Sequence, residues 1–302
     1  KLVIKGEIND CYLRAFLEST FEVFNGTKTG AAIPHLDKEA LYALTFSYPS
    51  LSEQRRIVTI LDDAFTDIAT AKANAEKNLQ NARSIFQTHL DSFFESNSNK
   101  KQEKLLMDAL ADQPRNGWSP PAANHSDTGT PVLTLSAVTG FKFRPEKIKH
   151  TSAPTNTDLH YWVVNGDLLL TRSNTPELVG HVAVVSDITQ PTIYPDLIMR
   201  MNADPHKAIN RFLYYQLRST KLRRIIMSRA HGANPTMKKV GKNDVQTLPI
   251  WLPPLDEQQK ITGELEELEA SSVNLGTIYR QKLTALDDLK KSLLHQAFSG
   301  QL

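Results

Sequence analysis

Residues 49–57 read Pro-Ser-Leu-Ser-Glu-Gln-Arg-Arg-Ile, and residues 253–261 repeat the pattern as Pro-Pro-Leu-Asp-Glu-Gln-Gln-Lys-Ile, at an offset of 204 positions. Two further matches precede this pair at an offset of 201 positions, Ile8-Asn9 with Ile209-Asn210 and Pro34 with Pro235. Because the three matches occur in the same order, chance is a poor explanation for them. The sequence therefore predicts a duplication in which residues 8–94 recur at 209–298. A period of about 200 residues is too long for a solenoid and indicates duplicated domains.

Each copy of the pattern opens a long helix. In the first copy, residues 54–113 contain no proline and residues 31–116 contain no glycine. Apolar or small residues recur there with spacings of three and four, as in a helix that packs along one side. They are Ile57, Leu61, Ala64, Ile68, Ala71, Ala75, Leu79, Ala82, Phe86, Leu90 and Phe93. Ser50 followed by Glu53 predicts a capping box at the start of this helix, which we expect at residues 53–96.

A second helix of similar length is expected at residues 256–298. Its apolar seam has the same spacing, and no proline follows Pro254. The seam consists of Ile261, Leu265, Leu268, Ser272, Leu275, Tyr279, Leu283, Leu286, Leu289 and Leu293. A long helix cannot bury such a seam alone, so two seams of matched length predict one antiparallel coiled coil.

The intervening residues 99–253 are expected to form an α+β domain. Short β-rich runs at residues 130–135, 161–170 and 181–185 alternate with turn residues, which predicts strands in a strongly curved sheet whose strand order stays open. Residues 208–228 are expected to be helical. The side chains expected on the buried side of that helix are Phe212, Leu213, Leu217, Leu222, Ile225 and Ile226.

The composition is typical of a globular protein. Of the 302 residues, 40% are hydrophobic and 23% are charged, with a net charge of +2. No run approaches the roughly 18 consecutive apolar residues of a membrane span. Cys11 is the only cysteine, which excludes an internal disulfide and agrees with a reducing cytoplasm. The first residues lack an initiator methionine and a signal-peptide pattern, so we expect a processed or shortened chain.

Basic residues concentrate in one stretch near the second repeat. Residues 205–243 contain no aspartate or glutamate. Their basic residues are Lys207, Arg211, Arg218, Lys221, Arg223, Arg224, Arg229, Lys238, Lys239 and Lys242. In a nearly neutral protein such a stretch favours a surface that faces phosphates. A solvated helix face is the alternative.

Three segments combine basic and polar side chains in the way that contacts with DNA bases require. Residues 231–239 include asparagine and lysine, which can pair with adenine and with guanine or phosphate. Residues 170–175 follow an apolar strand, and residues 141–144 alternate aromatic and basic side chains. The residues predicted to face DNA are Lys142, Arg144, Thr171, Arg172, Ser173, Asn174, Arg229, Asn234, Thr236, Lys238, Lys239 and Lys242. For each of them a structural turn or an ordinary surface position is the alternative.

Signatures of catalysis are missing from the sequence. It contains neither a glycine-rich nucleotide-binding motif nor a cysteine–histidine cluster of the zinc-binding type. The nine histidines show no ligand spacing. We therefore expect no catalytic residues, no metal and no cofactor in this chain.

The chain resembles the DNA-specificity subunits of Type I restriction-modification enzymes. The resemblance rests on residues 32–36 (Ala-Ile-Pro-His-Leu), on both helix-opening motifs, on residues 166–173 (Gly-Asp-Leu-Leu-Leu-Thr-Arg-Ser) and on residues 296–300 (Gln-Ala-Phe-Ser-Gly). It covers essentially the whole chain, and a motif that opens a long helix twice is quite specific.

This resemblance implies a non-catalytic subunit whose target-recognition domains each read one half of a split DNA sequence. The long helices separate these domains and bind the modification (methyltransferase) subunits. S-adenosylmethionine belongs to those subunits, and ATP with magnesium belongs to the restriction subunit. The implied parts are the C-terminal remnant of a first target-recognition domain at 1–50, a central helix at 51–98, a complete second domain at 99–253 and a C-terminal helix at 254–302. Because the front of the first domain is missing, a fragment or a natural truncation is expected.

The expected partners are double-stranded DNA, the modification and restriction subunits and, for a natural truncation, a second copy of the chain. The expected location is the cytoplasm, away from membranes. One alternative is a coiled-coil adaptor whose basic domain binds an acidic protein without reading DNA. A stand-alone nuclease is a further alternative, against which the missing motifs argue.

Overall fold

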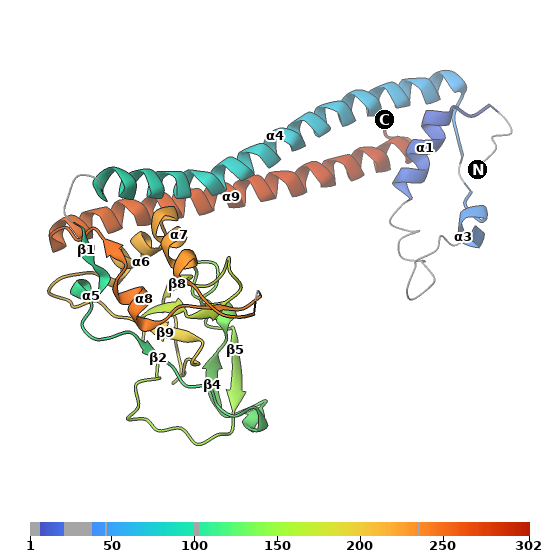
Figure 1. Cartoon of the computed structure of the whole chain (residues 1–302). Coiled ribbons are helices and arrows are strands. Elements are labelled where there is room, and N and C mark those ends of the chain that lie inside the picture. The colour runs from blue at the N-terminus through green and yellow to red at the C-terminus, as the bar shows by residue number, and fades with distance from the viewer. Residues whose placement is uncertain (1–6, 21–37, 46, 99–102, 235) are drawn as a thin grey trace. The chain divides into compact units, whose positions relative to one another are not determined.

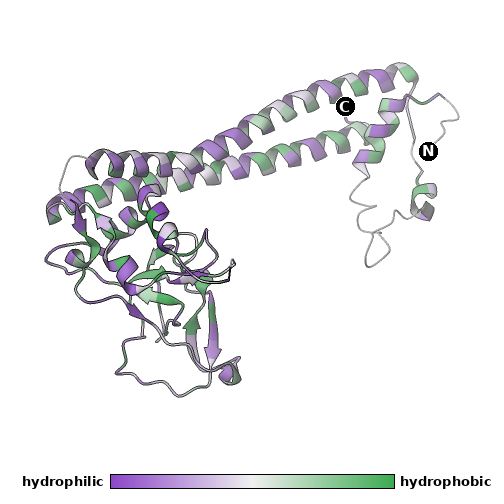
Figure 2. Cartoon of the chain, viewed as in Figure 1, coloured by the Kyte–Doolittle hydropathy of each residue, from purple (hydrophilic) through white to green (hydrophobic). Residues whose placement is uncertain are grey.

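The computed structural model describes residues 7–20, 38–45, 47–98, 103–234 and 236–302. The chain divides into two compact units, one from Lys1–Arg83 with Ser272–Leu302 and the other from Ser84–Ser271. Both long helices, α4 (Leu51–Ser98) and α9 (Leu255–Phe298), contribute a part to each unit (Figure 1). Figure 2 shows polar and apolar residues alternating along both helices, as expected of helices with one buried side. The two long helices predicted from the seams are therefore confirmed.

In the first unit, α1 (Asp10–Ser19) and α3 (Lys38–Tyr42) accompany parts of α4 and α9. Lys72 forms an ion pair of 2.6 Å with Asp287, and the hydroxyl of Ser272 bonds to the carbonyl oxygen of Ala82. Residue numbers rise along α4 as they fall along α9, so the helices run antiparallel here. The buried apolar residues of this unit include Tyr12, Ile57, Leu61, Leu294 and Ala297.

A buried glutamine joins the start of α4 to the start of α1. Gln54 is fully buried, and its Oε1 accepts a hydrogen bond of 2.8 Å from the backbone N–H of Asn9. Its Nε2 donates to the carbonyl oxygens of Glu7 (3.1 Å) and Pro49 (2.8 Å). Asn9 is also the N-cap of α1. One side chain thus satisfies three backbone groups at the point where two helices begin.

The same bonds recur in the second unit, where Gln258 of α9 faces the start of α6 (Asn210–Arg218). Its Oε1 accepts from the N–H of Ile209 at 3.0 Å, and its Nε2 donates to the carbonyl oxygens of Lys207 (2.9 Å) and Pro253 (2.8 Å). Ring packing recurs as well, because Tyr12 meets Phe298 edge-on in the first unit at 5.1 Å between centroids and Phe94 meets Phe212 edge-on in the second at 5.8 Å.

The recurring bonds correct one part of the predicted repeat. Asn9 is equivalent to Ile209, because both precede a helix and both donate to the clamping glutamine. The predicted match of Ile8-Asn9 with Ile209-Asn210 is therefore displaced by one residue. Asn210 has a different task, since its Oδ1 accepts from the N–H of Ala203 at 2.7 Å. The offset of 204 positions holds between Gln54 and Gln258.

The second unit adds short strands and helices to its parts of α4 and α9. In chain order they are β1 (Lys104–Leu105), α5 (Leu106–Ala109), β2 (Arg115–Asn116), η1 (Ala122–Asn124), β3 (His125–Ser126), β4 (Thr130–Leu133), η2 (Leu135–Ala137), β5 (Ile148–Thr151), β6 (Leu168–Thr171), β7 (Ser173–Asn174), β8 (Val182–Val184), β9 (Ile198–Arg200), α6, α7 (Thr220–Arg229), β10 (Lys238–Lys239), α8 (Lys242–Gln246) and β11 (Pro249–Ile250). The α+β class predicted from the sequence is confirmed.

Among the described residues, the strands form four small antiparallel sheets, where the sequence predicted one curved sheet. Their orders are β2-β9-β6-β8, β3-β5-β4, β1-β11 and β10-β7. Strand β6 is buried on both faces. Leu168 and Leu170 enter a core shared with α6, α7 and the long helices, whereas Leu169 enters a second core with Val132 and Tyr194. This follows from the period of two along a strand.

Two local helix predictions are wrong, one at a helix start and one within an expected helix. The capping box at the start of α4 is replaced by other contacts, because the hydroxyl of Ser50 lies 2.9 Å from that of Ser52 and the carboxylate of Glu53 pairs with Arg56. The helix predicted at residues 208–228 is broken at Ser219, whose ψ of 146° is extended. Asp91 of α4 then accepts from the N–H and the hydroxyl of Thr220 at 2.7 Å, and so caps α7.

Several features of the sequence argument lie outside the described residues. These are Pro34 with its match Pro235 and the Ala-Ile-Pro-His-Leu motif at 32–36. Among the residues that are described, no helix combines the length and apolar character needed to cross a membrane.

Candidate nucleic-acid interface

The three segments predicted to face DNA come together in the second unit. Strands β7 and β10 pair with Asn174 opposite Lys238 and Ser173 opposite Lys239, which joins the segments 170–175 and 231–239. The Nδ2 of Asn174 also lies 3.4 Å from the hydroxyl of Thr139, next to the segment 141–144. The sequence identified these segments separately, and the fold makes them neighbours.

The turn after β6 is closed by a buried hydroxyl. The Oγ1 of Thr171 donates to the carbonyl oxygen of Leu178 at 2.8 Å and accepts from the N–H of His181 at 2.9 Å. The N–H of Val240 donates to the carbonyl oxygen of Arg172 at 3.0 Å. These bonds fix the backbone from which Arg172 and Asn174 project.

The residues predicted to face DNA differ in exposure. The exposed ones are Lys142, Asn234, Thr236, Lys239 and Lys242, and the partly buried ones are Arg144, Arg172, Asn174, Arg229 and Lys238. Thr171 and Ser173 are fully buried, so their side chains lie in the interior. Exposure therefore separates side chains that are accessible to a ligand from side chains that shape the strand.

Several of these side chains also bond to the protein itself. Arg144 donates to the carbonyl oxygen of Thr139 at 2.5 Å, beyond the end of η2. Arg229 donates to the carbonyl oxygen of Asp244 at 2.7 Å and so ties α7 to α8. The Oδ1 of Asn234 accepts from the N–H and the hydroxyl of Thr236, both at 2.8 Å, which forms a local turn.

The acid-free stretch 205–243 does not form one solvated surface. Arg211 and Arg218 turn toward Glu266 and Glu269 of α9. Arg223 is 8% exposed and donates to the carbonyl oxygens of Val179 and Glu177, and burial lowers its pKa to about 10. Sequence reasoning missed these contacts because the two glutamates lie outside the stretch and backbone acceptors have no sequence signature.

A polar cleft of about 530 Å³ adjoins Lys242. The residues that line it are Asp112, Gln113, Arg115, Asn116, His160 and Lys242. Arg115 and His160 thus bring further nitrogen donors to the neighbourhood of α8. They stand singly in the sequence, about 80 to 130 positions before Lys242, so no local pattern could have identified them.

His181 is buried and stacks on Phe141, which belongs to the segment 141–144. Their rings stack with centroids 4.1 Å apart, and the Nδ1 of His181 accepts from the N–H of Gly140 at 2.8 Å. Burial, with a smaller contribution from the positive charge of Arg223, lowers the pKa of His181 to about 4. The imidazole is therefore neutral at pH 7 and serves as an acceptor for the loop backbone.

The residues that the structure describes contain no group of three histidine, cysteine, aspartate or glutamate side chains placed to hold a metal ion. Cys11 is exposed on α1 in the first unit and so lies outside the segments described above.

Comparison with known proteins places the chain in a family. A family model described as the Type I restriction modification DNA specificity domain matches residues 2–81 and 109–284. The EcoKI specificity subunit of Escherichia coli strain K12 is 24% identical over 285 residues, which cover 90% of this chain and 61% of that protein. The StySPI specificity subunit of Salmonella potsdam is also 24% identical, over 98% of this chain and 66% of that protein. The chain thus spans less than two thirds of the length of these relatives.

Solved structures show the same fold. A chain from a study of complex assembly and conformational transition in the type I R-M system has a TM-score of 0.76 at 20% identity, over 96% of this chain and 71% of that chain. The HsdS subunit from Thermoanaerobacter tengcongensis has a TM-score of 0.61 at 18% identity, over 98% of this chain and 71% of that chain. Since the family model matches well over half of the residues, this chain belongs to the Type I restriction-modification DNA specificity family.

Proposed function

We propose that the second unit reads one half of a split DNA target and that the chain itself is not catalytic. The observation that carries this proposal is the pairing of β7 with β10, which joins two polar segments and lies beside a third. Hydrogen-bond donors on a rigid strand pair suit contact with base edges in the major groove, which admits a two-stranded ribbon.

The proposed contacts divide by chemistry. The exposed Lys142, Lys239 and Lys242 suit phosphates, because lysine acts there as a flexible point charge. Arg172, Asn174 and Asn234 have the planar donor groups that read base edges, and we assign them that role. Thr171 and Ser173 shape the strand from inside.

The proposal includes partners. Modification subunits would bind the long helices α4 and α9 and carry out methylation, and a restriction subunit would cleave. A second copy of the chain would provide the other half-site reader if this chain works without a longer form. Methylome sequencing of cells that express the chain with its modification subunits tests these roles, and a split methylated motif is the expected result. Absence of any methylated motif, with all subunits present, would contradict them.

Direct binding tests the DNA reading itself. Duplexes are selected from a random library on the purified chain with its modification subunits, and affinity is then measured as a function of salt. We expect selection of a defined half-site and steep salt dependence. Salt-dependent binding without any sequence preference would contradict half-site reading and favour the adaptor with an acidic partner.

Lys239→Ala is expected to weaken binding to all duplexes about equally. If Lys239 contacts one phosphate, the slope of log affinity against log salt should decrease by roughly one. Lys207→Ala is the matched control, because Lys207 belongs to the same acid-free stretch but pairs with Asp204 at 3.1 Å. Equal salt slopes for the two variants would remove Lys239 from the interface.

Arg172→Ala is expected to act on one base position. It should cost about 1–3 kcal/mol on the selected half-site and relax the preference at a single position. Competition with the four possible base pairs at each position measures this. A uniform loss on all duplexes would instead assign Arg172 to the phosphate backbone.

A further inference from the structure

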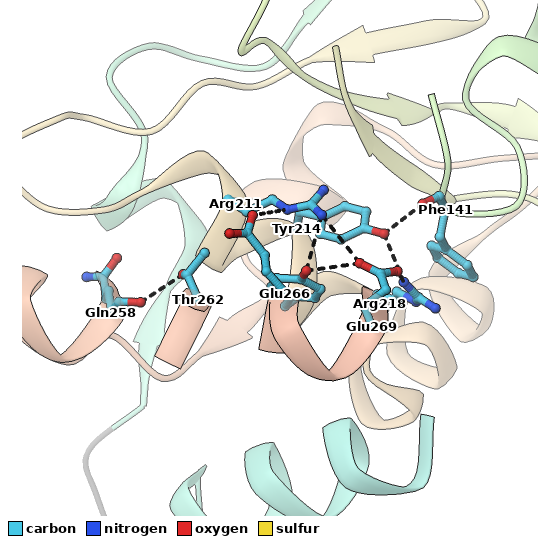
Figure 3. A network of polar contacts seen from close by, with 9 residues as sticks. Phe141, Arg211, Tyr214, Arg218, Gln258, Thr262, Glu266 and Glu269 are labelled. Carbon is cyan, nitrogen blue, oxygen red and sulfur yellow. Dashed lines mark hydrogen bonds and ion pairs between the residues drawn. The ribbon is translucent and has the colours of Figure 1, made fainter. Parts of the chain in front are cut away.

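Two cations of α6 face two carboxylates of α9 within the second unit (Figure 3). The Nε of Arg211 lies 2.9 Å from Glu266, and its Nη2 lies 3.3 Å from Glu269. The Nη1 of Arg218 bonds to the other oxygen of Glu269, and both of these side chains are largely buried. The guanidinium of Arg218 also lies 4.4 Å from the ring centroid of Phe86 on α4. Arg218 therefore contacts both long helices.

The network continues from Arg218 to the loop that carries Lys142. The Nη1 of Arg218 donates to the hydroxyl oxygen of Tyr214 at 2.9 Å, and that hydroxyl lies 2.6 Å from the carbonyl oxygen of Phe141. A guanidinium can only donate and a carbonyl can only accept, so the direction of both bonds is set. Burial raises the pKa of Tyr214, which keeps its proton in the bond to Phe141. Charge on Glu269 is thereby linked to the loop by consecutive hydrogen bonds, which polarise one another.

Phe141 is held in an unfavourable backbone conformation. Its φ of 61° is in the left-handed region, which side chains other than glycine rarely adopt. Three contacts surround its ring, namely His181 at 4.1 Å and the guanidinium groups of Arg218 at 5.4 Å and Arg223 at 5.7 Å. Such a conformation persists where neighbouring groups determine it. The bond from Tyr214 supplies the polar part of that constraint.

We infer that Tyr214 is a positioning residue for half-site reading. Its hydrogen bond to the Phe141 carbonyl holds the loop of residues 139–144 in place beside β7. The inference rests on the proposed DNA-reading function for its consequence, and on the hydrogen bonds alone for its mechanism. Thr139 at the start of the loop bonds to Asn174 at 3.4 Å, and Lys142 follows Phe141 directly. Movement of the loop would therefore displace a proposed phosphate contact and a proposed base contact together.

The chain offers a matched control in the next residue. Tyr215 is also buried on α6, and its hydroxyl donates to Glu269 at 2.9 Å and accepts from Arg211 at 3.2 Å. Both partners of this hydroxyl lie on α6 and α9, away from the loop. Tyr214→Phe and Tyr215→Phe each delete one buried hydroxyl from the same network, but only Tyr214→Phe removes the bond to the loop.

The experiment compares the two variants in the full chain with its modification subunits. Affinity is measured for the selected duplex and for a scrambled one across a range of salt concentrations. We expect Tyr214→Phe to lose roughly tenfold of its preference for the selected duplex, with an unchanged salt slope, while Tyr215→Phe keeps the preference. The midpoint temperature of thermal unfolding of the second unit should decrease by a similar amount in both variants. Equal preferences in the two variants would overturn the inference.

Amide hydrogen exchange keeps this test separate from the proposed function. Tyr214→Phe should raise exchange at residues 140–144 by tenfold or more relative to Tyr215→Phe, whether or not DNA is present. Faster loop exchange in a chain whose wild type selects no duplex would support the positioning role and contradict DNA reading. Unchanged loop exchange would overturn the positioning role whatever the DNA result.

Discussion

Gln258→Glu is expected to destabilise the second unit by about 3–5 kcal/mol. Gln258 is fully buried, and its Nε2 donates to the carbonyl oxygens of Lys207 and Pro253. A glutamate of the same shape would place a carboxylate oxygen against two carbonyl oxygens, so two donors are lost and a buried charge faces two negative dipoles. Protonation of the new carboxyl would restore only one of the two bonds.

Tryptophan fluorescence during urea unfolding measures this effect. The three tryptophans, Trp118, Trp162 and Trp251, all belong to the second unit, so their signal reports on that unit. Gln259→Glu is the control for added charge, because Gln259 is exposed on the same helix turn. An unfolding midpoint equal to that of Gln259→Glu would contradict the stabilising role of the Gln258 hydrogen bonds. Gln54→Glu makes the same lesion in the first unit and should shift the fluorescence transition far less.

Acidification is expected to destabilise the second unit through His181. The pKa of His181 is about 4 in the folded protein and near 6.5 when unfolded, so between these values the unfolded chain binds the additional proton. Stability therefore increases with pH in this window. The contribution of His181 to stability is fully present above pH 6.5. It decreases by up to about 3 kcal/mol as the pH drops toward 4. Protonation in the folded state would also break the bond from Gly140 to Nδ1.

The His181→Gln variant isolates this contribution. Glutamine keeps an acceptor for the N–H of Gly140 but does not titrate. Between pH 7 and pH 4.5 the free energy of unfolding of the wild type should fall by about 2 kcal/mol more than that of the variant. Parallel losses in the two proteins would show that other groups cause the acid sensitivity. The comparison at pH 4.5 also tests the contact with Phe141, because the ring of Phe141 stacks on the imidazole of His181.

The positions of the long helices were readable from the sequence because helical periodicity is local. Backbone bonds four residues apart create the spacing of three and four, so a short window contains the signal. The observed bounds of α4 and α9 lie within two residues of the predicted ones. The capping box failed because Glu53 had a competing partner, Arg56, one turn along the same helix.

The candidate interface was readable only in pieces. Arg172, Asn174 and Lys239 were identified by residue type and by their place after strands. Their proximity depends on the pairing of Ser173 with Lys239, whose hydrogen bonds join residues far apart in the chain. Several short strands offered alternative partners, and side-chain pattern alone does not choose among them.

The basic stretch shows the same limit for charge. Lysines and arginines were counted as one surface, but Arg211 and Arg218 pair with glutamates on α9 and Arg223 is buried. Composition reports how many charges a segment carries and says nothing about their direction.

By itself the sequence determined the duplication, the two long helices and the polar segments, because each is encoded within a few residues. The tertiary structure decided which strands pair, which arginines turn inward and what holds the Phe141 loop, because those contacts join distant residues and depend on burial that exists only in the folded chain.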